Sequence, residues 1–340
     1  MSTPVKRISL ALQGGGAHGA FTWGVLDHLI EDGRLAFEAI SGTSAGAMNA
    51  VVMADGWLNG GPDGARKGLE TFWRAISSDG KLSAAQRTIF DSLFTASPLR
   101  GFGIGDFWLG FFKQSASPYD FNPLNINPLK DFLEREIDFE RVRACKQFRL
   151  FIAATNVETG KGEVFEGKDL TADHVMASAC LPTVFQAVEI DGVPYWDGGY
   201  MGNPALYPLF YGTGTDDILL VQINPVERKG VPTTPRDIQN RLNEITFNAT
   251  LLRELRAIDF VARLVDKGNL STKDYKKVLM HRIALSQALN DLDASSKLTA
   301  KWDFFVMLKE AGRKAAKAWL ARHFNDLGQR ATIDLRKEFG

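Results

Sequence analysis

Short apolar runs alternate with helical patterns along the first two thirds of the chain. Strands are predicted where a run of Ile, Leu, Val and Phe is too short for a helix, and helices where apolar residues recur every three or four positions. The predicted strands are Ile8–Leu12, Phe37–Ser41, Arg149–Asn156 and Ile218–Asn224, and the predicted helices are Ala20–Glu31, Ala45–Ala54 and Ala172–Ala179. Apolar strands separated by helices are typical of a parallel sheet that is covered on both faces. The pattern therefore predicts an α/β fold of three layers with a mainly parallel central sheet.

Two segments interrupt this alternation. Asp55–Gly64 is rich in glycine and contains a proline, so it is predicted to be a loop. Phe90–Leu129 carries nine aromatic residues among glycines and prolines, at a spacing too irregular for one amphipathic helix. Such a segment can cover a pocket as a lid, or its rings can fill a small separate core. Both interpretations remain open.

The last third of the chain is predicted to be helical. Val226–Pro235 holds two prolines and Gly230 and marks a boundary, so we expect one domain over residues 1–225 and a helical C-terminal extension over residues 226–340. Within the extension, Phe304–Phe324 predicts an amphipathic helix. Its basic stripe is Lys309, Arg313 and Lys317, and its apolar stripe is Phe304, Leu308, Ala311 and Ala315. Such a helix usually packs on a domain, although it can also lie on anionic lipid.

Composition and charge are typical of a globular protein. The 340 residues include 40 basic and 40 acidic side chains, so nothing in the charge favours nucleic acid. The two cysteines, Cys145 and Cys180, form neither a metal-ligand pattern nor a disulfide framework, as expected in a reducing compartment. Met1–Gln13 lacks the apolar core of a signal peptide, and no run reaches the length of a membrane span. We expect a cytoplasmic protein with peripheral membrane contact at most.

Two glycine turns, each directly after a predicted strand, carry the candidate chemistry. The first, Gln13–Gly19, offers backbone N–H groups that can bind an oxyanion. The second, Gly42-Thr43-Ser44-Ala45-Gly46, is a G-x-S-x-G turn that exposes a serine hydroxyl at a strand-to-helix corner, so Ser44 is the candidate nucleophile. A dinucleotide site with Glu38 on the ribose and a simple bend with a capping serine are the alternatives.

A third turn, Tyr195-Trp196-Asp197-Gly198-Gly199, supplies a candidate base. A serine hydroxyl needs a group that accepts its proton. Histidine is the usual acceptor, and the chain has five. His18 lies in the glycine loop, His28 and His174 lie on predicted helices, and His281 and His323 lie in the C-terminal part. Two glycines after Asp197 allow a tight turn that brings its carboxylate close to another backbone, although Asp-Gly-Gly can also be a turn alone.

In this order the three motifs resemble those of the patatin-like phospholipase family. The resemblance covers roughly Arg7 to Asn224 and includes Ala177–Pro182, a small-residue helix end before a proline. It implies a three-layer patatin-like fold and a Ser-Asp dyad of Ser44 and Asp197, with no catalytic histidine. The residues that it assigns to the oxyanion site are Gly14, Gly15, Gly16 and Ala17, and the glycines that support the motifs are Gly19, Gly42, Gly46, Gly198 and Gly199.

The chain departs from the family at His18, where an arginine or lysine is common. The charge of the loop would then depend on pH near the ordinary histidine pKa of about 6.5, or His18 is only a spacer. The resemblance is weaker beyond Asn224, where Thr234–Ala249 is similar to a helical extension found on some bacterial members.

The resulting expectation is a lipid acyl hydrolase of the phospholipase A or esterase type. Its substrate is a lipid or another acyl ester, and the mechanism needs no metal ion and no cofactor. One alternative is an α/β-hydrolase-type carboxylesterase or thioesterase with a histidine such as His281 as the base. Another is a lipid-binding protein without turnover.

Overall fold

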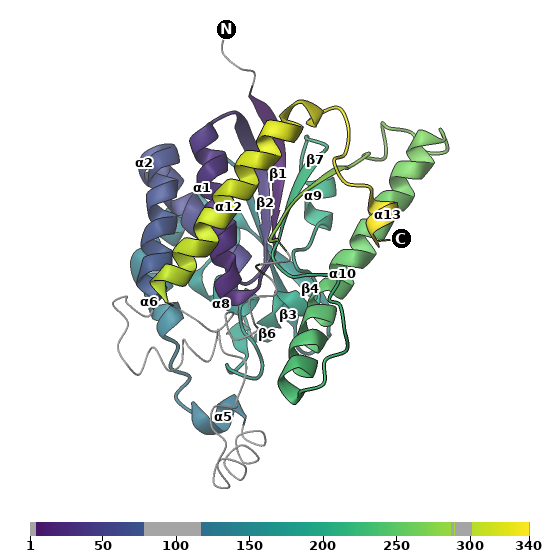
Figure 1. Ribbon diagram of the computed structural model, residues 1–340. Helices are drawn as coiled ribbons and strands as arrows, with labels where there is room; N and C mark the ends of the chain where they lie inside the picture. Colours follow the sequence, from purple (N-terminus) through teal and green to yellow (C-terminus); the bar gives the residue numbers. More distant parts are fainter. Residues whose placement is uncertain (1–4, 78–116, 287–288, 290–300, 340) are drawn as a thin grey trace.

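The protein is described by a computed structural model that covers residues 5–77, 117–286, 289 and 301–339. Its strands form one sheet in the order β5-β6-β3-β2-β1-β7-β8, with β4 beside β3 (Figure 1). The parallel pairs are β3–β2, β2–β1, β1–β7 and β7–β8. The pairs β3–β4, β3–β6 and β5–β6 are antiparallel. The strands are β1 Lys6–Leu12, β2 Leu35–Gly42, β3 Arg149–Asn156, β4 Gly162–Glu166, β5 Val188–Ile190, β6 Val193–Asp197, β7 Asp217–Gln222 and β8 Leu279–Ala284. The predicted α/β fold with a mainly parallel sheet is confirmed.

Helices cover both faces of this sheet. α1, α2 and α12 lie on one face, and α10 lies on the other with α9 and α13 near it (Figure 1). The helices are α1 Gly19–Asp32, α2 Ala45–Ile76, α5 Pro118–Phe121, α6 Pro128–Glu136, α7 Phe139–Arg143, α8 Ala172–Ser178, α9 Tyr207–Tyr211, α10 Pro235–Asp266, α12 Trp302–His323 and α13 Leu335–Phe339. Two short 3-10 turns belong to the site: η1 Gly16–His18 and η3 Gly198–Tyr200.

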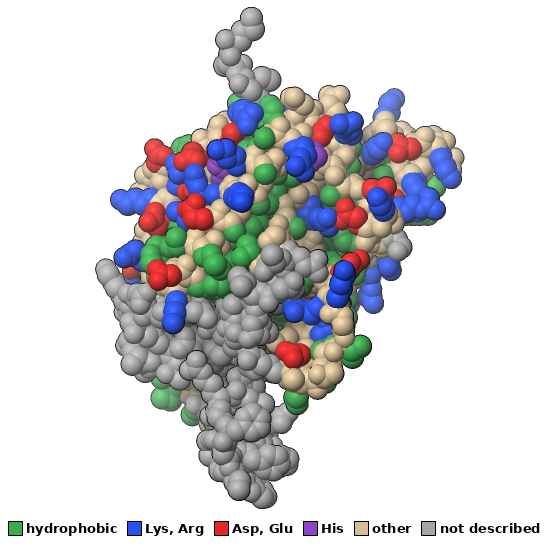
Figure 2. All heavy atoms as spheres, in the orientation of Figure 1, with side chains coloured by type: hydrophobic (Ala, Val, Ile, Leu, Met, Phe, Trp, Pro, Cys, Tyr) green, Lys and Arg blue, Asp and Glu red, His purple; other side chains and the backbone are tan. Residues whose placement is uncertain are grey.

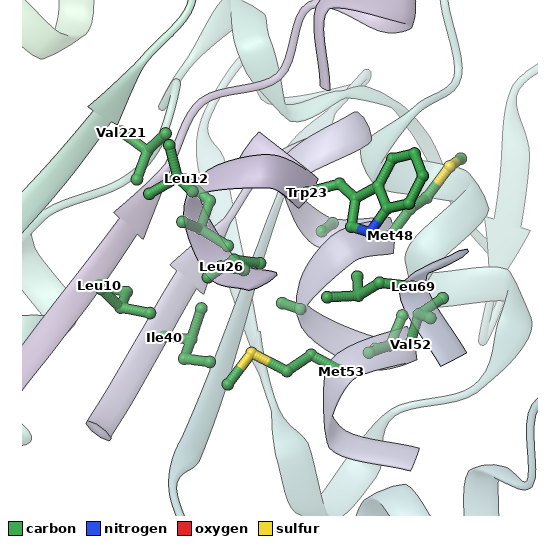
Figure 3. Packing of buried hydrophobic residues seen from close by; sticks show 14 of the residues in the cluster. Leu10, Leu12, Trp23, Leu26, Ile40, Met48, Val52, Met53, Leu69 and Val221 are labelled. Carbon is green, nitrogen blue, oxygen red and sulfur yellow. The ribbon is translucent and has the colours of Figure 1, made fainter. Parts of the chain in front are cut away.

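The core has two parts because successive side chains of a strand point to opposite faces. Leu10 and Leu12 of β1 pack with α1 and α2, where Trp23 and Leu69 are fully buried (Figure 3). Ala11, between them, belongs to the cluster under α10. Both faces of β1 are therefore buried, which explains why Ile8–Leu12 is apolar at every position except Ser9.

The segment Asp55–Gly64, predicted to be a loop, is helical instead. α2 continues through it and is broken only at Gly60 and Gly61, where Gly61 has φ of +62°. The two halves fold back on each other, so that Gly56 packs against the carbonyl of Gly64. The glycines serve close packing and one sharp turn rather than a loop, and sequence composition alone does not separate these uses.

The C-terminal part of the chain is built into the same fold. It is not only helical, as we expected for residues 226–340, because β8 pairs in parallel with β7 and extends the sheet. His281 and Arg282 interrupt the apolar pattern of β8, which hides it in the sequence. The domain boundary at residue 225 remains a prediction.

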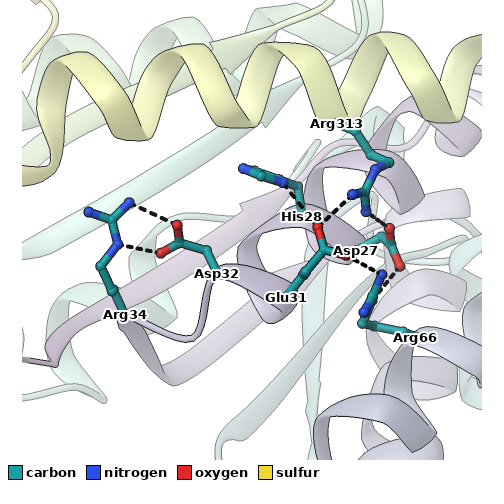
Figure 4. A network of polar contacts seen from close by, with 7 residues as sticks. All are labelled: Asp27, His28, Glu31, Asp32, Arg34, Arg66 and Arg313. Carbon is teal, nitrogen blue, oxygen red and sulfur yellow. Dashed lines mark hydrogen bonds and ion pairs between the residues drawn. The ribbon is translucent and has the colours of Figure 1, made fainter. Parts of the chain in front are cut away.

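α12 is joined to α1 by charge as well as by apolar contact. Arg313 pairs with Asp27 and Glu31 of α1, and Arg66 of α2 binds the same two carboxylates from the other side (Figure 4). Lys309 lies 4.4 Å from the centre of a Trp23 ring. Two members of the predicted basic stripe therefore face α1 rather than solvent or lipid.

The visible surface of the described residues carries Lys, Arg, Asp and Glu side chains in a mixed arrangement (Figure 2). No helix among these residues is long and apolar enough to cross a membrane. Most of the aromatic segment at 90–129 lies outside the described residues. Of its described part, Tyr119 is exposed and Leu129 is buried.

Candidate active site

Ser44 occupies the corner between β2 and α2. Its φ of 54° and ψ of −120° lie in a region that L-residues rarely adopt, so the turn holds the backbone under strain. The backbone N–H of Ser44 donates a hydrogen bond of 2.9 Å to Oγ of Ser178, which is fully buried at the end of α8. Ser44 itself stays partly exposed. This is the geometry that a G-x-S-x-G turn predicts.

Asp197 ends β6 and is buried beside β3. Its backbone N–H donates to the carbonyl of Cys180 at 2.7 Å, and Oγ1 of Thr155 donates to its carbonyl at 2.8 Å. A Cβ atom on Gly198 would lie 2.1 Å from the carbonyl oxygen of Ala153. Only glycine therefore allows the strand end to approach β3 this closely, which gives the Asp-Gly-Gly motif a specific structural reason.

The carboxyl group of Asp197 is tuned toward neutral pH. Burial raises its pKa from 3.8 to about 7, while hydrogen bonds from the backbone of Gly199 and the side chain of Ser44 act in the opposite direction. The Gly199 bond measures 2.7 Å to Oδ1. A general base works best when its pKa is close to the operating pH. The arrangement thus brings the two predicted catalytic residues together. It also gives Asp197 a pKa that is suited to a general base.

The glycine loop lies against Ser44. A Cβ atom on Gly14 would be 2.7 Å from Cβ of Ser44. In the described residues, the backbone N–H groups of Gly15, Gly16 and Ala17 have no hydrogen-bond acceptor. They precede α1, where the positive end of a helix dipole favours an anion.

Gly14 differs from the other three residues predicted to bind the oxyanion. Its N–H already donates a hydrogen bond of 2.6 Å to Oδ1 of Asn203. It therefore cannot donate to a substrate oxygen at the same time. This leaves the N–H groups of Gly15, Gly16 and Ala17 as the candidate oxyanion donors, while the Gly14 bond anchors the loop to Asn203.

His18 lies buried behind the loop. Its exposed fraction is 1 %, and its ring centre is 6.4 Å from that of Phe304 in α12. A larger arginine with a permanent charge would be costly at this position. Burial against an aromatic ring favours the spacer interpretation of His18 over that of a charged group.

His281, the histidine base of the alternative mechanism, is engaged elsewhere. Its Nε2 lies 2.8 Å from Oδ1 of Asp217, and its Nδ1 lies 3.0 Å from Oγ1 of Thr332. β8 is three strands from β2, a separation of roughly 14 Å at the usual strand spacing. The strand register aligns His281 with Ile40, four residues before Ser44. The geometry disfavours a triad through His281.

Three buried polar residues at the site were not found from the sequence. Asn203, Asn224 and Ser178 contact the glycine loop or Ser44 through their side chains. A signal was available for Asn224, because polar residues at the carboxyl ends of parallel strands often belong to sites.

Burial also raises the pKa of the Cys180 thiol to about 12, so this thiol stays protonated at neutral pH.

Comparison with protein families agrees with the motifs at this site. The family model described as patatin-like phospholipase matches residues 10–210. A search of curated proteins gave no match.

Among solved structures, VipD from Legionella pneumophila is 16 % identical with a TM-score of 0.45, covering 98 % of this chain and 73 % of that one. The type III effector protein ExoU is 14 % identical with a TM-score of 0.38, covering 94 % and 54 %. An ExoU–SpcU complex from Pseudomonas aeruginosa matches at 20 % identity and a TM-score of 0.31, covering 73 % and 51 %. This chain thus spans about half the length of the two ExoU chains.

Proposed function

The chain belongs to the patatin-like phospholipase family, and from this premise we propose that it hydrolyses acyl esters of lipids with Ser44 as nucleophile and Asp197 as general base. The observation that carries the proposal is the contact of the Ser44 side chain with a buried carboxyl group whose pKa is about 7. A carboxylate with that basicity can accept the serine proton at neutral pH without a histidine.

In the first half of the reaction, ionised Asp197 takes the hydroxyl proton of Ser44 while Oγ attacks the ester carbonyl carbon. The carbonyl oxygen becomes an oxyanion and accepts hydrogen bonds from the free N–H groups of Gly15, Gly16 and Ala17. The intermediate then collapses. The bond to the alcohol breaks, and the alcohol oxygen receives the proton from Asp197, which leaves an acyl ester on Ser44.

In the second half, Asp197 removes a proton from a water molecule that attacks the acyl carbon. The same N–H groups stabilise the second oxyanion. The bond to Oγ breaks, Ser44 recovers its proton from Asp197, and the fatty acid leaves. Both halves use the same base and the same donors, so the site needs only these residues and water.

The proposal is tested with a fluorophosphonate probe and a panel of phospholipids, glycerides and short-chain p-nitrophenyl esters. We expect the probe to label the wild type and not S44A. S44A and D197N should each lower kcat by on the order of 10³ or more, with little additional loss in the double variant, because residues of one unit are not additive.

Two outcomes would contradict the proposal. A folded protein that neither reacts with the probe nor releases fatty acid would support the alternative of lipid binding without turnover. Hydrolysis that persists in S44A would move the nucleophile elsewhere.

A further inference from the structure

The segment that follows Asp197 contacts both the nucleophile strand and the glycine loop. Oγ of Ser41 donates to the carbonyl of Ala205 at 2.5 Å, and Oγ1 of Thr43 donates to the carbonyl of Gly202 at 2.6 Å. Asn203, between these two anchors, is 1 % exposed. The anchors hold the Asn203 side chain against Gly14.

Two asparagine side chains bind both polar groups of Gly14. Oδ1 of Asn203 accepts the Gly14 N–H at 2.6 Å, and Nδ2 of Asn224 donates to the Gly14 carbonyl at 2.6 Å. Nδ2 of Asn203 lies 3.4 Å from the same carbonyl. Both side chains are buried, so these bonds are not in competition with bulk water.

A third amide fixes the two asparagines. Oε1 of Gln13 accepts the backbone N–H groups of Ile223 and Asn224, both at 2.9 Å. Nε2 of Gln13 donates to the carbonyl of Asn203 and to Oδ1 of Asn248 in α10, both at 3.2 Å. The side chains around Gly14 are therefore held by the residues that follow β7, by α10 and by the segment after β6.

The geometry of the peptide unit links this arrangement to catalysis. The carbonyl of Gly14 and the N–H of Gly15 belong to one planar trans peptide and point in opposite directions. Whatever fixes the carbonyl also fixes the N–H. If this peptide flipped, the Gly14 carbonyl oxygen would take the direction that the Gly15 N–H group now has, and a hydrogen-bond donor would be replaced by an acceptor.

We propose that Asn224 and Asn203 are positioning residues for the oxyanion site. Asn224 holds the carbonyl of the Gly14–Gly15 peptide, so that the N–H group of this peptide is directed at the oxyanion, and Asn203 fixes the preceding peptide through the Gly14 N–H. This rests on the proposed function, because it assigns a role within that reaction. The two residues touch neither the nucleophile nor the reacting carbonyl, and they act through the backbone of the glycine loop.

The test compares N224A and N203A with N156A. Asn156 is also buried and uses its side chain for two hydrogen bonds, to Glu163 and Thr159, without contact to the glycine loop. We expect N224A and N203A to lower kcat on a p-nitrophenyl ester by about 10²-fold, the usual effect of a lost or misdirected oxyanion donor. KM should stay within about twofold, and the pH midpoint of N224A should not move because Asp197 is untouched. N156A should keep kcat within about threefold.

N224S provides a second variant if N224A does not fold, because a serine hydroxyl is too short to reach the Gly14 carbonyl. A wild-type kcat in N224A and N203A, a change in KM alone, or an equal loss in N156A would overturn the inference. A wild type no more active than S44A would instead refute the proposed function. The positioning is then judged by hydrogen exchange at the Gly14 amide, which should accelerate in N203A but not in N156A. Unchanged exchange in N203A would overturn the inference on its own.

Discussion

D197N should stabilise the protein at alkaline pH while abolishing its activity. Folding transfers the Asp197 carboxyl from water to a site where burial raises its pKa from 3.8 to about 7. Keeping the group ionised there costs on the order of 4 kcal/mol at 1.36 kcal/mol for each pKa unit. Asparagine has nearly the same shape and no charge. It retains an oxygen that can accept the Gly199 N–H.

The sign of the effect follows from proton binding. Below about pH 4 the carboxyl is protonated in both states, so the charge contributes no difference. Between about pH 4 and 7 the folded protein binds a proton that the unfolded chain has lost, and stability falls as pH rises. Above about pH 7 the folded state carries the full cost. The advantage of D197N should therefore grow across this range and then level off.

Thermal unfolding measured from pH 4.5 to 8.5 checks this prediction. For a chain of 340 residues, 2–4 kcal/mol corresponds to a rise in Tm of about 3–6 °C at the alkaline end. E158Q, which removes an exposed carboxyl group, should give a difference that does not change with pH. If D197N is less stable than the wild type at pH 8.5, or if its difference is independent of pH, the account of a buried charge is wrong.

Three further predictions concern activity and packing. The kcat/KM of the wild type should rise with pH to a midpoint near 7, because only ionised Asp197 accepts a proton; a midpoint near 4 would exclude the buried base. H281A should retain most activity while lowering Tm, since His281 binds Asp217 and Thr332; a large loss of kcat in a folded variant would restore the triad. In denaturant unfolding, R313A should lose about 1–3 kcal/mol because Asp27 and Glu31 lose a charged partner. K317A on the exposed side of the same helix should change by less than about 0.5 kcal/mol, and equal losses would show that Arg313 contributes no special contact.

The sequence was most informative where function depends on local pattern. The strand β1 and the corner at Ser44 could be predicted because apolar runs, small residues and turn glycines are read within a few positions. The turn at Asp197 was identified for the same reason. A local pattern does not identify the residues that contact these motifs from distant parts of the chain.

The positioning of Gly14 shows this limit. Its partners Asn203 and Asn224 lie 189 and 210 residues away, and only the order of the strands brings them together. The burial of His18 likewise depends on Phe304 in α12. The helical residues on both sides of Gly60 and Gly61 are predicted to be a loop because composition signals a break in the chain but not its length.

The bond between Gln13 and Asn248 has a consequence for the order in which this protein becomes active during its synthesis. The proposed nucleophile Ser44 is made early, but Asn248, the side-chain partner of Gln13, is made 235 residues after Gln13. Arg313, which joins α12 to α1, comes later still. Because a chain emerges from its N-terminus onward, a nascent fragment would carry the serine without the contacts that complete its surroundings. Premature release of such a fragment should not liberate a competent hydrolase.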